Sequence, residues 1–141
     1  MPALATAIVK RNKITMKILV AEDEPLMLMA IEAKLKNDGF EVTGVSDGQQ
    51  ALKEIEKSLP DLIITDILMP YTSGLELIGI VRTNAKKIPI IVLSGIGEED
   101  TVMEAFQLGA DDFLTKPFNA TELSVRVKRL LKIPTTPAKR K

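Results

Sequence analysis

Carboxylate, hydroxyl and ammonium groups follow four separate apolar runs in the sequence. Glu22-Asp23-Glu24 and Asp66 supply the carboxylates, Ser94 the hydroxyl and Lys116 the ammonium. Carboxylates that lie close together resist ionising together unless a cation sits between them. Mg²⁺ suits such a group, with Mn²⁺ as an alternative, because it prefers octahedral oxygen ligands and keeps several waters. The residue types therefore predict a magnesium site with a position open to a phosphate oxygen.

These side chains can meet only if the elements that carry them end at one edge of a sheet. Five short apolar runs, rich in β-branched residues, are predicted as strands: 18–21, 42–45, 62–65, 88–93 and 113–115. Apolar residues with helical spacing lie between and after these runs. Runs 62–64 and 90–93 show no polar alternation, which is typical of strands buried on both faces. The alternation of strand and helix predicts an α/β fold with a doubly wound, five-stranded parallel sheet and five helices.

The predicted helices and strands end at recognisable signals. Gly39 follows the first helical pattern, and Asn119 with Glu122 three residues later resembles a capping box. In an open α/β sheet, ligands bind beyond the carboxyl ends of the strands, where the polar residues are predicted to converge. The plainer alternative for Glu22-Asp23-Glu24 is a solvated turn that favours the positive end of the next helix.

Length and composition limit the classes of protein to consider. The 141 residues fit one domain, and 45% hydrophobic with 27% charged residues is ordinary for a folded globular chain. Cysteine and histidine are both absent, which excludes thiolate or histidine zinc sites and serine-histidine hydrolysis. If phosphate arrives through a histidine, another protein must supply that histidine.

The two ends of the chain differ from its body. All 19 acidic residues lie within 16–131, whereas seven of the 19 basic residues lie outside that range. We predict a flexible N-terminal extension over 1–15, one domain over 16–132 and a basic C-terminal tail over 133–141. The apolar piece at 3–9 precedes its basic residues, the wrong order for a secretory signal, and no apolar run approaches the roughly 20 residues that span a bilayer. We therefore expect a cytoplasmic protein without membrane contact.

Four motifs, in this order, resemble the receiver domains of bacterial two-component response regulators, which have the CheY-like, flavodoxin-like fold. They are Ile-Leu-Val-Ala-Glu-Asp-Glu-Pro at 18–25, Pro-Asp-Leu-Ile-Ile-Thr-Asp-Ile-Leu-Met-Pro at 60–70 with Gly74, Pro-Ile-Ile-Val-Leu-Ser-Gly at 89–95, and Gly-Ala-Asp-Asp-Phe-Leu-Thr-Lys-Pro-Phe at 109–118. One short motif is a weak signal, but four in the right order on predicted strand ends are specific.

The resemblance implies a phosphorylation site. Asp66 is implied as the phosphoacceptor, whose carboxylate attacks the phosphorus of a phosphohistidine to give an acyl phosphate. Glu22, Asp23, Asp66 and the backbone carbonyl of Leu68 are implied as the Mg²⁺ site, with Glu22 where aspartate is more usual. Lys116 would neutralise the phosphoryl oxygens.

The resemblance also implies a switch. Ser94 would hydrogen-bond the attached phosphoryl group and draw its loop inward, and Phe113 would turn into the vacated space. A strand aromatic is by default a core residue, which is the competing expectation for Phe113. Gly95 stands where a small residue such as alanine is usual, and this leaves access to the phosphate open. Lys116-Pro117 resembles the family's cis peptide.

The implied protein is a signalling switch that catalyses only its own phosphorylation and dephosphorylation. Its implied donor is a sensor histidine kinase or a histidine phosphotransfer protein, and its downstream protein partner would bind over 98–131. We see no DNA-recognition element and expect no direct DNA binding. Some receivers dimerise on phosphorylation, and four residues resemble their charged set, although the basic partner expected around 102–104 is missing: Asp111, Asp112, Glu122 and Arg126.

Three other functions fit the residues less well. A phosphatase with an aspartyl-phosphate intermediate typically carries a second acid two residues after the nucleophile, where this chain has Leu68. A flavin or nucleotide binder would need a loop rich in glycine, serine or threonine after the first strand, but Glu22-Asp23-Glu24 would repel a metal-free phosphate. A receiver that has lost phosphorylation is disfavoured because all four chemical positions are filled.

Overall fold

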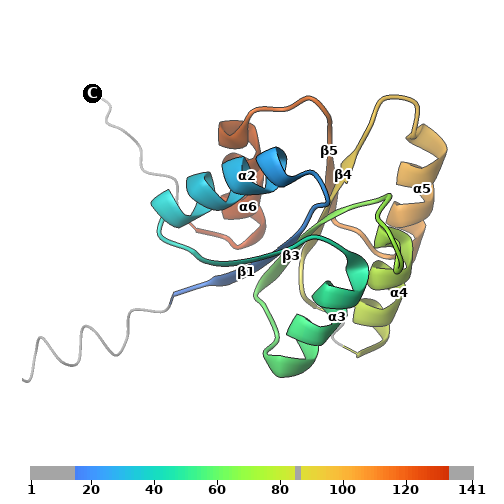
Figure 1. The fold of residues 1–141 in the computed structure, drawn as a ribbon, viewed down its shortest axis with the longest axis horizontal. Coiled ribbons are helices and arrows are strands. Elements are labelled where there is room, and N and C mark those ends of the chain that lie inside the picture. The colour runs from blue at the N-terminus through green and yellow to red at the C-terminus, as the bar shows by residue number, and fades with distance from the viewer. Residues whose placement is uncertain (1–14, 85–86, 134–141) are drawn as a thin grey trace, which may run out of the picture.

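The structure is a computed structural model that describes residues 15–84 and 87–133. Its strands are β1 (Lys17–Ala21), β2 (Glu41–Val45), β3 (Leu62–Asp66), β4 (Ile90–Ser94) and β5 (Asp112–Thr115). Its helices are α2 (Pro25–Asn37), α3 (Gly48–Lys57), α4 (Gly74–Asn84), α5 (Glu99–Leu108) and α6 (Ala120–Leu130). All strand pairs are parallel, and the strand order is β2-β1-β3-β4-β5. The strands run through the middle of the domain, between the helices (Figure 1). The predicted α/β, doubly wound fold with five strands and five helices is confirmed.

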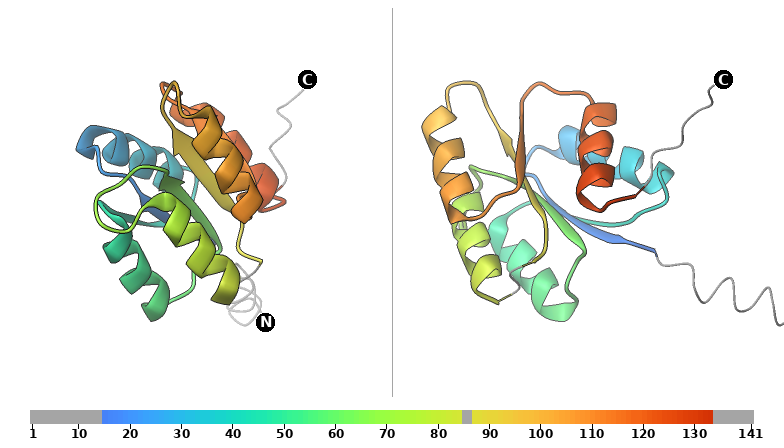
Figure 2. Two further views of the ribbon diagram at one scale, coloured as in Figure 1. Left: turned by 90° about the vertical axis from the view of Figure 1, so that its right-hand side faces the viewer. Right: turned by 180° about the vertical axis from the view of Figure 1, so that it is seen from behind.

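Helices cover both faces of the sheet, so the domain has three layers. Helices α2 and α6 lie together on one face, and α3, α4 and α5 lie on the other (Figure 2). Each face has its own apolar core. Successive residues of β3 alternate between the two cores, because strand side chains point to opposite faces: Ile63 packs with α3, α4 and α5, whereas Leu62 and Ile64 pack with α2 and α6. This explains the absence of polar alternation in β3.

The predicted strands are correct within two residues at each end. The fourth strand was predicted to begin at 88 but begins at Ile90, since Pro89 lacks the N–H that a ladder needs. Asp66 and Ser94 are the last residues of β3 and β4, rather than the first residues of the loops that follow. The sheet itself therefore fixes the backbone of both residues.

The helix ends follow the predicted signals in part. Gly39, with a φ of +99°, lies just after the end of α2. The Asn119 side chain accepts a hydrogen bond from the Glu122 N–H at 2.7 Å at the start of α6. The Glu122 carboxylate lies 3.5 Å from Nη2 of Arg126, so it extends along the helix instead of completing the capping box.

Apart from their last or first residue, the predicted N-terminal extension (1–15) and basic tail (133–141) lie outside the described residues. The domain limits at 16 and 132 stay predictions. Within residues 15–84 and 87–133, none of the helices has both the length and the apolar character needed to cross a bilayer.

Candidate functional site

The register of the sheet brings the acidic residues together at its carboxyl edge. Ala21 of β1 pairs with Thr65 of β3, so the residues that follow them, Glu22 and Asp66, emerge side by side. The Glu22 N–H donates to the Val45 carbonyl at 3.0 Å, which extends the β1–β2 ladder by one residue. Two segments that are 44 residues apart in the chain thus present carboxylates at one place.

Glu22, Asp23 and Asp66 form a cluster that could hold a metal ion. Each offers a carboxylate oxygen, and these oxygens all lie within 4.8 Å of one another. Asp23 is exposed, but Glu22 and Asp66 are buried, at 0% and 7% exposure. Oε1 of Glu22 is buried and accepts no hydrogen bond from the described residues, although it lies 3.1 Å from the Lys116 ammonium. A buried carboxylate oxygen left without a hydrogen bond fits a site for a hard cation such as Mg²⁺.

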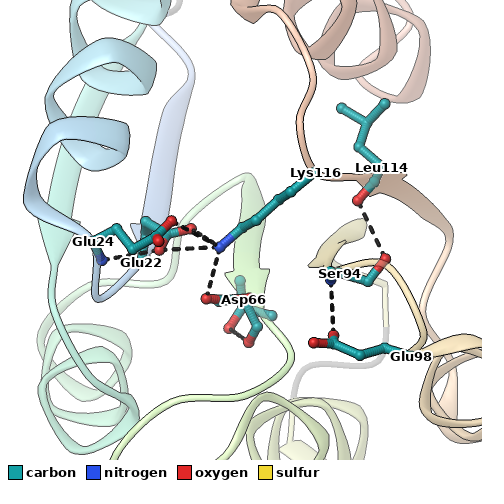
Figure 3. A network of polar contacts seen from close by, with 9 residues as sticks. Glu22, Glu24, Asp66, Ser94, Glu98, Leu114 and Lys116 are labelled. Carbon is teal, nitrogen blue, oxygen red and sulfur yellow. Dashed lines mark hydrogen bonds and ion pairs between the residues drawn. The ribbon is translucent and has the colours of Figure 1, made fainter.

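Lys116 forms ion pairs with two members of this cluster and with Glu24. Its Nζ lies 3.1 Å from Oδ2 of Asp66, 3.1 Å from Oε1 of Glu22 and 3.3 Å from Oε1 of Glu24 (Figure 3). The Lys116 N–H donates to the Ser94 carbonyl at 2.7 Å, which fixes its backbone beside the end of β4. The Lys116–Pro117 peptide is cis, as the resemblance implies.

Glu24 is a partner of Lys116 that the sequence did not identify. It precedes α2 without accepting a cap hydrogen bond through its side chain, and its carboxylate extends to the ammonium instead. The plainer expectation of an acidic turn that favours a helix N-terminus therefore does not describe Glu24 fully. The only available signal was its position next to two predicted metal ligands.

The electrostatics of the cluster follow from burial. Burial, assisted by the charge of Glu22 and opposed by Lys116, raises the pKa of Asp66 to about 7. Burial also raises the pKa of Glu22 above its usual range, against its hydrogen bonds to Glu24 and Lys116. Burial alone would lower the pKa of Lys116, but its hydrogen bond with Asp66 and the surrounding carboxylates outweigh burial and raise it. The two buried carboxylates thus resist ionising together, which an added cation would relieve.

Gly74 packs closely against the backbone of Asp66 and Ile67. A Cβ at this position would collide with the Asp66 carbonyl, and the Gly74 N–H donates to the Ile67 carbonyl at 2.8 Å. The close approach explains why glycine follows Asp66 at this spacing. The carbonyl of Leu68, the fourth implied metal ligand, belongs to the same loop, and its role stays a prediction.

Ser94 lies next to the cluster but its hydroxyl is directed toward β5. The residue is buried, and its Oγ donates a long hydrogen bond of 3.5 Å to the Leu114 carbonyl (Figure 3). In the sheet, Asp66 pairs with Leu93, so Ser94 is one position beyond the residue opposite Asp66. The structure therefore places Ser94 near Asp66 with its hydroxyl already engaged by another acceptor.

Phe113 is at the surface and not in the core. It is 36% exposed, and its ring meets that of Phe106 edge to face, with centroids 5.8 Å apart. Beside it lies a pocket of about 230 Å³ between β5, α5 and the loop after β4, lined by Ser94, Val102 and Thr115 among others. The default expectation of a core aromatic is thus wrong, and the inward turn stays a prediction.

The four charged residues that resemble a dimerisation set form ion pairs and hydrogen bonds within the single chain. Arg126 pairs with Asp112 at 2.8 Å and with Glu122 at 3.5 Å. Asp111 accepts from Arg82 and from the Ile90 N–H, both at 2.8 Å. Asp111 therefore ties α4 to β4 in the single chain, and dimerisation stays a prediction.

Comparison with known proteins agrees with this geometry. Residues 18–128 match the family model for the response regulator receiver domain. The chain is 38% identical over 116 residues to the alkaline phosphatase synthesis transcriptional regulatory protein PhoP of Bacillus subtilis, covering 82% of this chain and 48% of that protein. It is 38% identical over 118 residues to the phosphate regulon transcriptional regulatory protein PhoB of Rhizobium meliloti, covering 82% of this chain and 52% of that protein. The chain thus spans about half the length of the curated relatives it matches.

Two solved structures show the same likeness over nearly their whole length. The receiver domain of Francisella response regulator 1452 has a TM-score of 0.77 and 36% identity, covering 84% of this chain and 98% of that one. The chemotaxis response regulator CheY4 of Vibrio cholerae has a TM-score of 0.78 and 30% identity, covering 83% and 99%.

Proposed function

Because the chain belongs to the response regulator receiver family, we propose that it receives a phosphoryl group on Asp66 in a Mg²⁺-dependent reaction. The observation that carries this proposal is the position of the Asp66 carboxylate, 3.1 Å from the Lys116 ammonium and within 4.8 Å of the Glu22 and Asp23 carboxylates. A nucleophile, a fixed positive charge and a set of metal ligands therefore share one edge of the sheet.

The proposed donor is a phosphohistidine on a sensor histidine kinase or a histidine phosphotransfer protein, and none of the 141 residues is a histidine that could take this role. A carboxylate oxygen of Asp66 attacks the phosphorus in line, the P–N bond to the imidazole breaks, and an acyl phosphate forms. The leaving imidazole takes up a proton. The ammonium of Lys116 neutralises charge on the phosphoryl oxygens during the transfer.

Glu22, Asp23 and Asp66, with the backbone carbonyl of Leu68, would hold the divalent ion. Mg²⁺, or Mn²⁺ in its place, supplies positive charge that stabilises the phosphoryl oxygens and reduces repulsion among the carboxylates. Burial raises the pKa of Asp66 to about 7, whereas the nucleophile is the ionised carboxylate. A divalent cation held by these residues would favour ionisation of Asp66, which supports the metal assignment.

The phosphoryl group would act as a switch. It adds a charge of about −2 and three strong acceptors beside Ser94. We propose that Ser94 turns from Leu114 to the phosphoryl group and that Phe113 then moves toward the pocket behind it. The surface over 98–131, formed by α5, β5 and α6, would change its affinity for a protein partner, and self-phosphorylation with dephosphorylation would be the only catalysis.

Intact-mass analysis tests the proposal directly. The protein is incubated with acetyl phosphate and Mg²⁺, beside Asp66→Asn and a control, Asp100→Asn, on the exposed side of α5. Wild type and Asp100→Asn should gain one phosphoryl group, while Asp66→Asn and chelator-treated wild type should gain none. Equal labelling of Asp66→Asn would exclude Asp66 as the acceptor.

A further inference from the structure

We propose that Glu98 is a positioning residue that holds the Ser94–Gly95 segment in its unphosphorylated arrangement. The Glu98 carboxylate accepts a hydrogen bond from the Gly95 N–H, a donor at the edge of the proposed phosphoryl site. This hydrogen bond stabilises the unphosphorylated arrangement of the loop, and a phosphoryl group on Asp66 must outweigh it before the loop moves. This inference rests on the proposed phosphorylation of Asp66 and extends it to a residue that sets how readily the loop responds.

The contact is local and specific. Oε1 of Glu98 accepts a hydrogen bond from the Gly95 N–H at 2.9 Å. Figure 3 shows the Glu98 carboxylate directed back toward Ser94, the residue before Gly95. Glu98 is also the N-cap residue of α5, where a carboxylate commonly accepts from the first free N–H groups of the helix. Its side chain makes no such cap bond and turns back to the loop instead.

Glycine at position 95 makes this contact possible. A Cβ built on Gly95 would lie 2.9 Å from Oε2 and 3.5 Å from Cδ of Glu98, so a side chain there would push the carboxylate away. Gly97, with a φ of +91°, supplies the left-handed turn that brings Glu98 back toward Gly95. The absence of a side chain at Gly95 therefore leaves room for the Glu98 carboxylate at this distance.

Both donors of this segment are satisfied before any phosphoryl group arrives. The Ser94 hydroxyl bonds the Leu114 carbonyl at 3.5 Å, a long and weak contact, whereas the Gly95 N–H bonds a charged carboxylate at 2.9 Å. A phosphoryl group on Asp66 brings more acceptors and more negative charge to the same edge. The stronger of the two existing bonds, and thus the main opposition to loop movement, is the one to Glu98.

Glu99 provides a matched control. It is the same residue type one position further on and is exposed at the start of α5. Within the described part of the chain, it makes no hydrogen bond or ion pair through its side chain. A general effect of negative charge near α5 should therefore appear in both Glu98→Ala and Glu99→Ala, whereas the positioning effect should appear only in the first.

The test measures affinity for beryllofluoride, which binds a carboxylate as a phosphoryl mimic, in the presence of Mg²⁺ by NMR titration of backbone amides. Glu98→Ala should bind about three- to tenfold more tightly than wild type, the ratio expected when one hydrogen bond that favours the unbound state is removed. Glu98→Gln, which keeps a weaker acceptor, should lie between them, and Glu99→Ala should match wild type. In the free protein, the Gly95 amide should exchange hydrogen faster in Glu98→Ala.

A double-mutant cycle separates the contact from other effects of the loop. Gly95→Ala should also increase beryllofluoride affinity, but it should add nothing in a Glu98→Ala background, because the contact is already lost. If a folded Glu98→Ala protein bound beryllofluoride with unchanged or weaker affinity, or if the effects of Glu98→Ala and Gly95→Ala were additive, the role of Glu98 would be overturned. The proposed phosphorylation of Asp66 would still stand. Absence of a phosphoryl group on wild type after acetyl phosphate treatment would instead overturn the proposed function.

Discussion

The Lys116 ammonium and the Asp66 carboxylate lie 3.1 Å apart, although 50 positions separate them in the chain. The same ammonium is 3.1 Å from the fully buried Glu22. One lysine therefore compensates two buried acids whose ionisation burial opposes. In the absence of a metal ion, this lysine stabilises the folded site, and its removal has a thermodynamic effect as well as a chemical one.

Lys116→Met should lower the free energy of unfolding by about 2 to 3 kcal/mol at neutral pH in chelator, because the buried carboxylates lose their counter-charge. Urea denaturation measures the loss. Mg²⁺ should restore part of it by binding the folded state. Lys57→Met, which removes an ion pair to Glu54 from a side chain that is 72% exposed, should cost less than about 1 kcal/mol. Equal losses in the two variants would contradict the structural role of Lys116.

Asp66 should make metal-free stability depend on pH. Its pKa is raised from 3.8 to about 7 by burial and by the charge of Glu22, so the folded state holds the Asp66 proton more tightly than the unfolded state does. The contribution of Asp66 to the free energy of unfolding is fully present below about pH 4 and is lost as the pH rises through about 7. The free energy of unfolding then falls by at most about 1.4 kcal/mol per pH unit. Urea denaturation in chelator across that range should show wild type losing stability relative to Asp66→Asn. A difference that stays constant with pH would contradict the pKa assignment.

Asp111→Ala should destabilise the single chain by about 1 to 2 kcal/mol, since it removes an acceptor for Arg82 and for the Ile90 N–H. Chemical denaturation at low protein concentration measures this change. Asp100→Ala, an exposed acid on α5, is the control and should change stability by less than about 0.5 kcal/mol. If Asp111 acted only at a dimer interface, its removal would leave monomer stability unaltered.

Phe113 should separate from Phe106 when the phosphoryl mimic binds. The ring centroids are 5.8 Å apart in the structure, close enough for nuclear Overhauser effects between ring protons. These should weaken on addition of beryllofluoride and Mg²⁺, while contacts of the buried Phe40 ring in the opposite core stay unchanged. Phe106–Phe113 contacts that persist in the fully bound protein would show that the aromatic ring takes no part in the switch.

The fold was predictable because its signals are local or periodic. Ile63 and Ile64 belong to a run without polar alternation, and such a run requires a helix layer on each face of the sheet. Glu22 follows β1 and Asp66 ends β3, and parallel strands present their carboxyl ends at one edge of the sheet. Composition and order along the chain were thus sufficient to predict the elements, their layers and the group of residues that meet at the edge.

The contacts between side chains depend on how distant segments pack together. Glu24 pairs with Lys116 across 92 positions, Glu98 turns from its helix to Gly95, and Phe113 remains outside the core. No periodic pattern in the sequence predicts these three arrangements. Each depends on the geometry of a loop and on which of several neighbouring donors and acceptors pair. Residue types and their order along the chain were enough to predict which chemical groups meet at the edge of the sheet. Packing between distant segments set which carboxylates share the charge of Lys116.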